Sequence, residues 1–310
     1  MPYSVTEINE AIRRDPAGFA RDCDAAYMEK VRNAAGKIAA HHGESHIVLL
    51  SGPSGSGKTA VTLNVRDALK TLGITSHTVS MWDYLIPSDS ETVPRDQHGD
   101  VDYLSPFSLD ADLLNRHFAM LDRGELIQIP EFEFAWQTRS DTLTRPMRLG
   151  KDEIVIFEGV HALNDIIAGK NSKAFKLYIA ARSDIFDGEN LLFDRAWIRL
   201  CRRIAHDFHL GAWVRFTLRM WEKARQRELL YISPYKKNAD LMFDSSLPFS
   251  ASALKPFVVP LLEQLPKGKH QVVKDILRAY EKIDSLDERF IAPDSLARAF
   301  IGGNTHSHTD

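Results

Sequence analysis

The stretch Gly52-Pro53-Ser54-Gly55-Ser56-Gly57-Lys58-Thr59 decides the fold of this chain. It matches G-x-x-x-x-G-K-[ST], the pattern of a phosphate-binding loop. The preceding run 47–50 is apolar and predicts a buried strand, and the apolar spacing of residues 60–69 predicts a helix. A glycine-rich turn with an incidental lysine is the alternative, but strand, loop and helix together are the context that the motif requires.

The chemistry of this loop predicts a bound nucleotide. Glycines let the backbone approach a ligand closely, and the amides and the start of the helix then face the phosphates. We expect Lys58 to reach the β- and γ-phosphates and the Thr59 hydroxyl to hold Mg²⁺. The candidate cofactor-binding residues are Gly52, Ser54, Gly55, Ser56, Gly57, Lys58 and Thr59.

Composition narrows the class of protein. The chain has 310 residues, 44% hydrophobic and 26% charged, as is ordinary for a globular protein. A net charge of −3 favours neither nucleic acid nor an anionic membrane, and no apolar run approaches the ~20 residues of a membrane span. Cys23 and Cys201 have no metal spacing, so we expect reduced thiols. We therefore expect a cytoplasmic protein with a small-molecule partner; a homo-oligomer is left open.

Further strands and helices alternate along the chain, which predicts a mainly parallel sheet with helices on both faces. Residues 126–130 and 131–134 suggest strands or a short hairpin. The predicted strands are 75–80, 153–158, 176–180 and 240–244, and the predicted helices are 109–121, 187–208, 213–229, 251–265 and 270–283. We expect an N-terminal helical segment at 1–45, a catalytic domain at 46–266, and a C-terminal helix with a flexible tail at 267–310, whose His306 and His308 we do not expect to bind metal.

Three groups of side chains have the chemistry that phosphoryl transfer needs. Glu158 ends a buried strand, where it could bind Mg²⁺ directly or through water; a turn acid is the alternative. Asp83 also follows a strand and could accept the proton of the acceptor or help to hold the metal, or could be only a turn residue. Arg199, Arg202 and Arg203 share one helix face and could close over the phosphates as a lid, although a basic helix face is often simply solvated.

The order of these motifs resembles the uridine kinase and phosphoribulokinase family of P-loop kinases. The resemblance runs from about Ile47 to Leu265. It rests on the stretches 52–59, 80–84, 109–114, 129–139, 157–163 and 199–207. Residues 231–235, 239–248 and 253–256 also resemble a bacterial uridine kinase-like branch.

The resemblance implies a fold and an activity. The fold is that of the P-loop NTPases, an α/β/α three-layer arrangement with a mainly parallel sheet, here with a helical lid and helical N- and C-terminal additions. It implies ATP or GTP as the donor, Mg²⁺, and a hydroxyl group as the acceptor, and it supports the arginine lid. It also implies that Phe132, Phe134 and Arg139 line the acceptor pocket; the alternatives are core packing for the two aromatic rings and a surface cation for Arg139. Tyr84 and Gln137 are further substrate-binding candidates, although Phe132 and Gln137 stand where nucleoside kinases of the family have Tyr and His.

The chain departs from this family on the acceptor side. Trp82 stands where nucleoside kinases of the family have an acid, so that Asp83 either takes over that role or the acid is lost. Leu104 aligns with the acid that holds the ribose. The acceptor is therefore a nucleoside such as uridine or cytidine, or instead a sugar phosphate, a pantothenate-like acid or a polyol. A degenerate nucleotide-binding regulator is a further alternative, whereas the Asp96-Gln97-His98-Gly99 stretch lacks the context of a GTPase switch.

Overall fold

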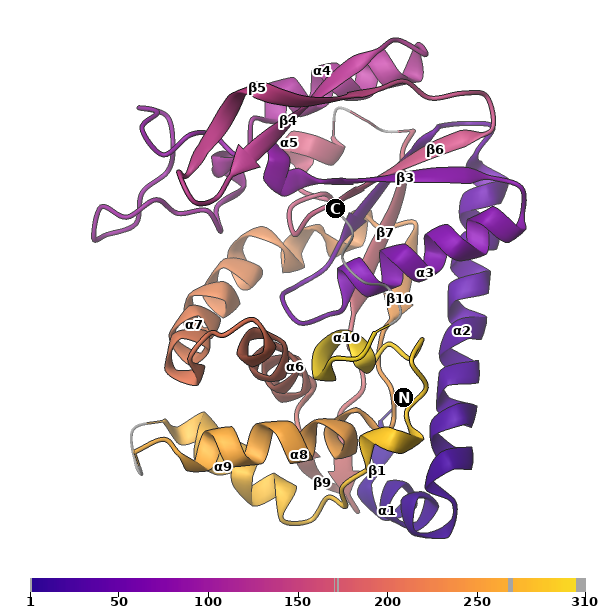
Figure 1. The fold of residues 1–310 in the computed structure, drawn as a ribbon, viewed down its shortest axis with the longest axis vertical. Helices are drawn as coiled ribbons and strands as arrows, with labels where there is room; N and C mark the ends of the chain where they lie inside the picture. Colours follow the sequence, from indigo (N-terminus) through magenta and orange to yellow (C-terminus); the bar gives the residue numbers. More distant parts are fainter. Residues whose placement is uncertain (1, 170, 172, 267–269, 305–310) are drawn as a thin grey trace.

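Five parallel strands form the central sheet of the computed structural model, which describes residues 2–169, 171, 173–266 and 270–304 (Figure 1). The strand order is β10-β7-β2-β6-β3. The bounds are β2 (Ile47–Ser51), β3 (Thr75–Ser80), β6 (Glu153–Glu158), β7 (Phe175–Ala180) and β10 (Leu241–Asp244). Every residue of β2 is buried, as expected for a parallel strand covered on both faces.

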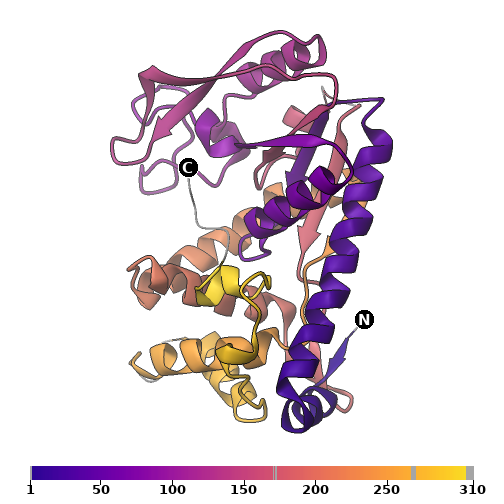
Figure 2. The same ribbon diagram turned by 45° about the vertical axis from the view of Figure 1, so that its right-hand side comes forward.

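Alternate residues of β2 point into two different cores, which confirms the predicted three layers. Val48 and Leu50 pack with residues of α2 (Pro16–His41) and α3 (Lys58–Thr71). Ile47 and Leu49 pack with residues of α4 (Ala111–Asp122) and α5 (Asp165–Ala168). Figure 2 shows α2 and α3 together on one side of the sheet.

The predicted N-terminal helices are present as α1 (Val5–Arg14) and α2. They are part of the same core as the central sheet, because Val31 and Ile38 of α2 are buried in the cluster that contains Val48. The short strand β1 (Tyr3–Ser4) pairs in parallel with β8 (Ile185–Asp187).

Two sequence predictions were wrong in detail. The predicted helix 187–208 begins only at Arg195, because β8 and β9 (Asn190–Phe193) form a hairpin that turns at Gly188, with a φ of 60°. The segments 126–130 and 131–134 are one strand, β4 (Ile127–Glu133), which pairs with β5 (Thr138–Met147). The polar sequence of β5 gave no strand signal; within the described residues β4 and β5 pair only with each other, in a two-stranded ribbon.

The remaining helices form the lower half of the molecule in Figure 1. They are α6 (Arg195–His209), α7 (Val214–Tyr231), α8 (Ser250–Glu263), α9 (Gln271–Tyr280) and α10 (Arg298–Ile301). Helix α8 contains Pro256 and Pro260 and continues through both. Short 3-10 helices are η1 (Met81–Tyr84), η2 (Pro106–Ser108), η3 (Ser233–Asn238) and η4 (Glu288–Phe290).

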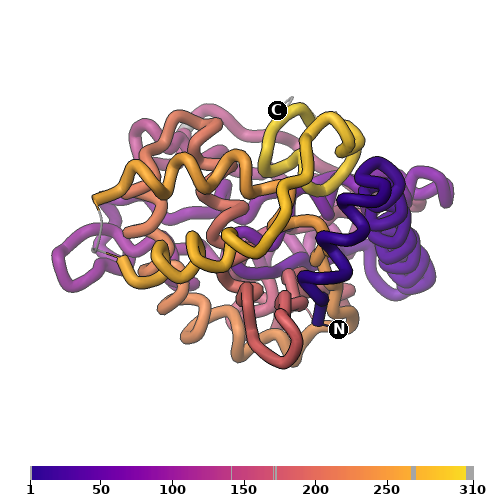
Figure 3. The backbone as a smooth tube through the Cα atoms, turned by 90° about the horizontal axis from the view of Figure 1, so that it is seen from below, coloured from indigo at the N-terminus to yellow at the C-terminus, as the bar shows by residue number. Residues whose placement is uncertain are grey.

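The C-terminal part is not a detached tail as far as the structure describes it. Figure 3 shows it crossing the base of the molecule from α9 towards the N-terminal helices. Leu296, Phe300 and Ile301 are buried in the same core as α6 and α8. The predicted flexible end includes His306 and His308, which lie outside the described residues. No helix in the described part of the chain is long and apolar enough to cross a membrane.

Candidate active site

The phosphate loop connects β2 to α3 and is shaped by close backbone approaches. A Cβ atom on Gly52 would lie 2.2 Å from the carbonyl oxygen of Ile179, and one on Gly55 would lie 2.4 Å from that of Arg199. Gly55 and Gly57 also have positive φ angles of 73° and 85°, which only glycine adopts readily. The glycines predicted for this loop are therefore required by its geometry.

The start of α3 is open to an anion. Gly57 occupies the N-cap position and, among the described residues, no side chain caps the helix. The Ser56 hydroxyl is buried and has no hydrogen-bond partner in the described structure. Unpaired amide and hydroxyl donors at the positive end of a helix are well suited to phosphate oxygens.

Lys58 begins α3 and is partly buried. Burial is the main cause that lowers the pKa of Lys58 from its ordinary value, and the neighbouring Glu158 carboxylate opposes this shift. The guanidinium groups of Arg203 and Arg199 lower it further. The ammonium group is therefore in surroundings that an added anion would make more favourable.

Thr59 and Glu158 meet at the carboxyl edge of the sheet. The Thr59 hydroxyl donates a 2.7 Å hydrogen bond to the Glu158 carboxylate. The strand register explains the contact, because Glu158 of β6 lies between Leu50 of β2 and Ser80 of β3, immediately before the loops that follow those strands. The sequence prediction that both side chains serve one metal is compatible with this placement.

The Thr59 hydroxyl oxygen and the Glu158 carboxylate oxygens are suitable ligands for Mg²⁺. This ion prefers oxygen ligands and commonly uses one or two protein groups together with waters and substrate phosphates. Within the described residues no cluster of three or more His, Cys, Asp or Glu side chains could hold a metal alone. A hydroxyl and one carboxylate therefore suit an ion that arrives with a nucleotide.

The three arginines of α6 do not form the exposed lid that the sequence predicted. Arg199 is buried; it donates to both carboxylate oxygens of Glu228 at 3.0–3.1 Å and to the Ser54 carbonyl at 3.0 Å. Arg202 is also buried and donates to the Ser245 carbonyl and the Ser250 hydroxyl, both at 3.0 Å. These contacts hold two of the three guanidinium groups inside the protein.

Arg203 remains placed as a lid residue would be. Its side chain is 47% exposed and forms an ion pair with Asp207 at 2.7 Å. Its guanidinium also lies 3.4 Å from the Ser54 hydroxyl of the phosphate loop. Among the predicted lid residues, Arg203 is the one that the structure leaves facing the phosphate loop from the solvent side.

The substrate-binding candidates near η1 have structural partners. Tyr84 is fully buried, and its hydroxyl lies 2.9 Å from Nδ1 of His117. The prediction that Tyr84 contacts an acceptor was therefore wrong, because its side chain is inside the protein. Arg139 forms a 3.1 Å ion pair with Asp110 and donates to the Leu85 carbonyl. It joins η1 to the start of α4 instead of presenting a free guanidinium to a base. Burial raises the pKa of Tyr84 above its ordinary value.

Asp83 lies on η1 and forms a 2.9 Å ion pair with Arg145 of β5. Its role as base or metal ligand stays a prediction. Trp82, Phe134 and Phe132 form a row of edge-to-face rings, with centroids 6.1 Å and 5.1 Å apart. Phe132 is buried whereas Phe134 is 61% exposed, so only part of the predicted aromatic pair is accessible. Gln137 is exposed at the β4–β5 turn, with a φ of 51°.

A cleft of about 760 Å³ opens beside the phosphate loop. Its lining includes Lys58, Thr59, Glu158 and Arg203, together with Trp82 and Tyr103. The loop 94–104 covers the cleft from one side and α7 from the other. Ion pairs join the two, from Lys223 to Asp96 at 3.0 Å and from Arg227 to Asp102 at 2.6 Å.

The family assignment follows from comparison with known proteins. A model described as the phosphoribulokinase / uridine kinase family matches residues 47–249, more than half of the chain. The chain belongs to this family. A uridine kinase of Staphylococcus aureus (strain JH9) is 26% identical over 200 residues, which cover 63% of this chain and 86% of that protein.

Two solved structures are similar to this phosphoribulokinase/uridine kinase family member. One, described as a possible uridine kinase from Bacillus stearothermophilus, has a TM-score of 0.42 and 18% identity and covers 64% of this chain and 88% of its own. The other, D-glycerate 3-kinase from Cryptococcus neoformans var. grubii, has a TM-score of 0.36 and 18% identity. Its match covers 84% of this chain and 89% of its own.

Sequence reasoning missed residues that shape the site of this family member. His161 follows β6, and its Nε2 lies 3.0 Å from the Leu104 carbonyl, which anchors the end of the loop 94–104. Burial lowers the pKa of His161 to about 4, so the ring is neutral near neutral pH. The partners of Lys223 and Arg227 were also missed, because an ion pair between a loop and a helix more than a hundred residues away leaves no local pattern.

Proposed function

We propose that the chain is an ATP-dependent small-molecule kinase that transfers the γ-phosphoryl group to a hydroxyl group. The observation that carries this proposal is the 2.7 Å contact between Thr59 and Glu158 beside Lys58, at the mouth of the 760 Å³ cleft. A phosphate cradle, a metal site and a second cavity next to them are the parts that phosphoryl transfer requires.

Each residue of the site has a task in this proposal. Lys58 and the amides at the start of α3 bind the β- and γ-phosphates, and Thr59 and Glu158 hold the Mg²⁺. Bound Mg²⁺ supplies positive charge to the phosphate oxygens. Arg203 approaches the transferred group from the cleft, where a cation stabilises developing negative charge.

Asp83 is the proposed base. The ion pair with Arg145 occupies one oxygen of the Asp83 carboxylate. To act as the base, Asp83 would have to exchange this contact for one with the acceptor hydroxyl. The Arg145 side chain is 55% exposed, so solvent can replace this contact, and hydrogen bonds of a catalytic base often form only when the substrate is bound.

A nucleoside such as uridine or cytidine is the proposed acceptor. Trp82 and Tyr103 line the cleft, and aromatic faces suit a flat base. A sugar phosphate, a pantothenate-like acid or a polyol is the second candidate. It is favoured by Arg139, whose ion pair with Asp110 and hydrogen bond to Leu85 occupy the guanidinium that would otherwise bind the edge of a base.

An ADP-release assay with MgATP across nucleosides, sugars, sugar phosphates, polyols and hydroxy acids tests the proposal. For a nucleoside acceptor, Trp82→Ala should raise the KM for the acceptor about tenfold or more, because a stacking ring is lost. Trp136→Ala is the matched control, since this tryptophan is 75% exposed and does not line the cleft. Tight ATP binding without any phosphorylated product would instead support a nucleotide-binding regulator.

A further inference from the structure

A second cavity, of about 390 Å³, lies on the other side of the phosphate loop. It shares Gly55, Lys58, Thr59 and Arg203 with the larger cleft. A triphosphate held on the loop would therefore have one cavity at each end. Glu158 and Trp82 line only the larger cleft, which assigns the metal and the acceptor to that side and leaves the smaller cavity for the rest of the donor.

Helix α6 contributes one side of the smaller cavity. Its residues Arg203, His206 and His209 recur at three-residue intervals and all line the cavity. The imidazole rings therefore continue, away from the phosphates, the helix face that carries Arg203. Planar rings that follow a cation along one face are suited to a nucleotide, whose base lies beyond its phosphates.

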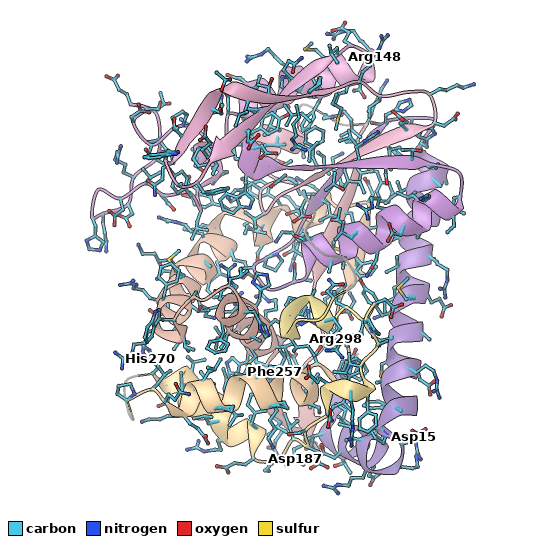
Figure 4. The ribbon with its side chains drawn as sticks, viewed as in Figure 1. Asp15, Arg148, Asp187, Phe257, His270 and Arg298 are labelled. Atoms are coloured by element: carbon cyan, nitrogen blue, oxygen red, sulfur yellow. The ribbon has the colours of Figure 1, made fainter. Side chains whose placement is uncertain are left out.

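The C-terminal segment contributes the opposite side. Arg298, Phe300 and Asn304 line the cavity, and Figure 4 labels Arg298 on α10, between α6 and the N-terminal helices. These residues lie outside the stretch 47–249 that matches the family model. The region shared with the family therefore encloses this cavity only in part.

Internal contacts hold the C-terminal segment in place. The Arg298 guanidinium donates to the Glu288 carbonyl at 2.7 Å and to the Ile291 carbonyl at 3.0 Å, which fixes α10 against the preceding turn. The Arg202 guanidinium lies 4.8 Å over the ring of Phe300.

The same segment is packed directly against the phosphate loop. A Cβ atom on Gly57 would lie 3.2 Å from Leu296 and 3.3 Å from Phe300. The segment and the phosphate loop therefore lie side by side, and residues of both line the smaller cavity.

We propose that the segment 296–304, together with the imidazole face of α6, forms the subsite for the purine base and ribose of the donor nucleotide. This inference rests on the proposed kinase function. Arg298 and Phe300 position the segment through the contacts described above. His209 and Asn304, which line the cavity from α6 and from the segment, contact the base.

Calorimetry with two probes, MgATP and magnesium tripolyphosphate, separates the base subsite from the phosphate loop. The test variant is His209→Ala/Asn304→Ala, since His209 is exposed and Asn304 is half-buried, so their loss should leave the fold intact, as circular dichroism would verify. Its matched control is Arg289→Ala, which alters an exposed side chain of η4, just before this segment, that does not line the cavity.

The double variant should bind MgATP about tenfold or more weakly, while its affinity for tripolyphosphate stays within about twofold of the wild type. Equal losses for both probes, or no loss for either, would overturn the base subsite. A wild-type protein that binds tripolyphosphate as tightly as ATP would overturn it as well while leaving the phosphate loop intact. A wild-type protein that binds neither probe would refute the proposed kinase function itself.

Discussion

Removal of the Glu228 carboxylate should destabilise the protein strongly. The side chains of Arg199 and Glu228 are only 4% and 9% exposed, and three hydrogen bonds of 3.0–3.1 Å join them. In Glu228→Ala the guanidinium keeps the Ser54 carbonyl and the Trp221 ring, 5.4 Å away, but loses its counter-charge. Leaving one member of a buried ion pair unpaired costs about 3–5 kcal/mol, a large part of the usual stability of a domain.

Urea unfolding followed by circular dichroism measures this loss. Glu222→Ala, on the exposed face of the same helix, is the matched control and should change the free energy of unfolding by less than about 0.5 kcal/mol. The double variant Arg199→Met/Glu228→Leu should recover much of the loss, because an apolar pair leaves no buried charge.

The result also decides what Arg199 does. If Glu228→Ala loses less than about 1 kcal/mol and lowers only kcat, then Arg199 is a mobile lid residue and the ion pair is not structural. If stability falls as expected, Arg199 is a positioning residue that holds the Ser54 carbonyl of the phosphate loop.

Three further predictions concern single side chains. Asp83→Asn should lower kcat about 100-fold if Asp83 is the base, and a loss under threefold would move that role elsewhere. Arg203→Ala should lower kcat by about 100-fold with little change in ATP affinity, because it acts on developing charge; an effect on affinity alone would contradict this. His161 has a pKa of about 4 when folded and 6.5 ordinarily, so the unfolded chain binds the proton first as the pH falls. Wild-type stability should therefore drop by roughly 3 kcal/mol more than that of His161→Gln between these pH values, and parallel curves would refute the assignment.

The fold was predictable where a local pattern reports a local cause. Every side chain of the run 47–50 is apolar, so both faces of this strand must be buried by other parts of the protein. The glycines in 52–59 occur where the loop backbone approaches its neighbours closely. Glu158 was found for the same reason, because the end of a buried strand in a parallel sheet lies at the ligand-binding edge.

The rest depended on contacts between distant segments. Spacing alone placed Arg199, Arg202 and Arg203 on one helix face, but it could not show that Glu228 and Ser250 hold the first two inside the protein. A basic helix face looks the same in sequence whether its partners are ligands or buried protein groups.

Tyr84 and the C-terminal segment show the same limit. Tyr84 was a substrate-binding candidate, whereas in the structure its hydroxyl pairs with His117. The segment near Phe300 gave no sequence signal for a site, because its position against Gly57 results from the packing of the whole C-terminal region.

Phosphorus NMR of MgATP mixed with the acceptor panel tests the central claim most directly, with wild-type protein and Lys58→Met compared at equal concentration. The wild type should form ADP and a phosphomonoester in equal amounts, only when both Mg²⁺ and an acceptor are present. Lys58→Met, folded by circular dichroism, should form neither. Undiminished turnover in Lys58→Met, or no acceptor-dependent phosphomonoester with the wild type, would contradict the proposal that the phosphate loop, Thr59 and Glu158 form a kinase site.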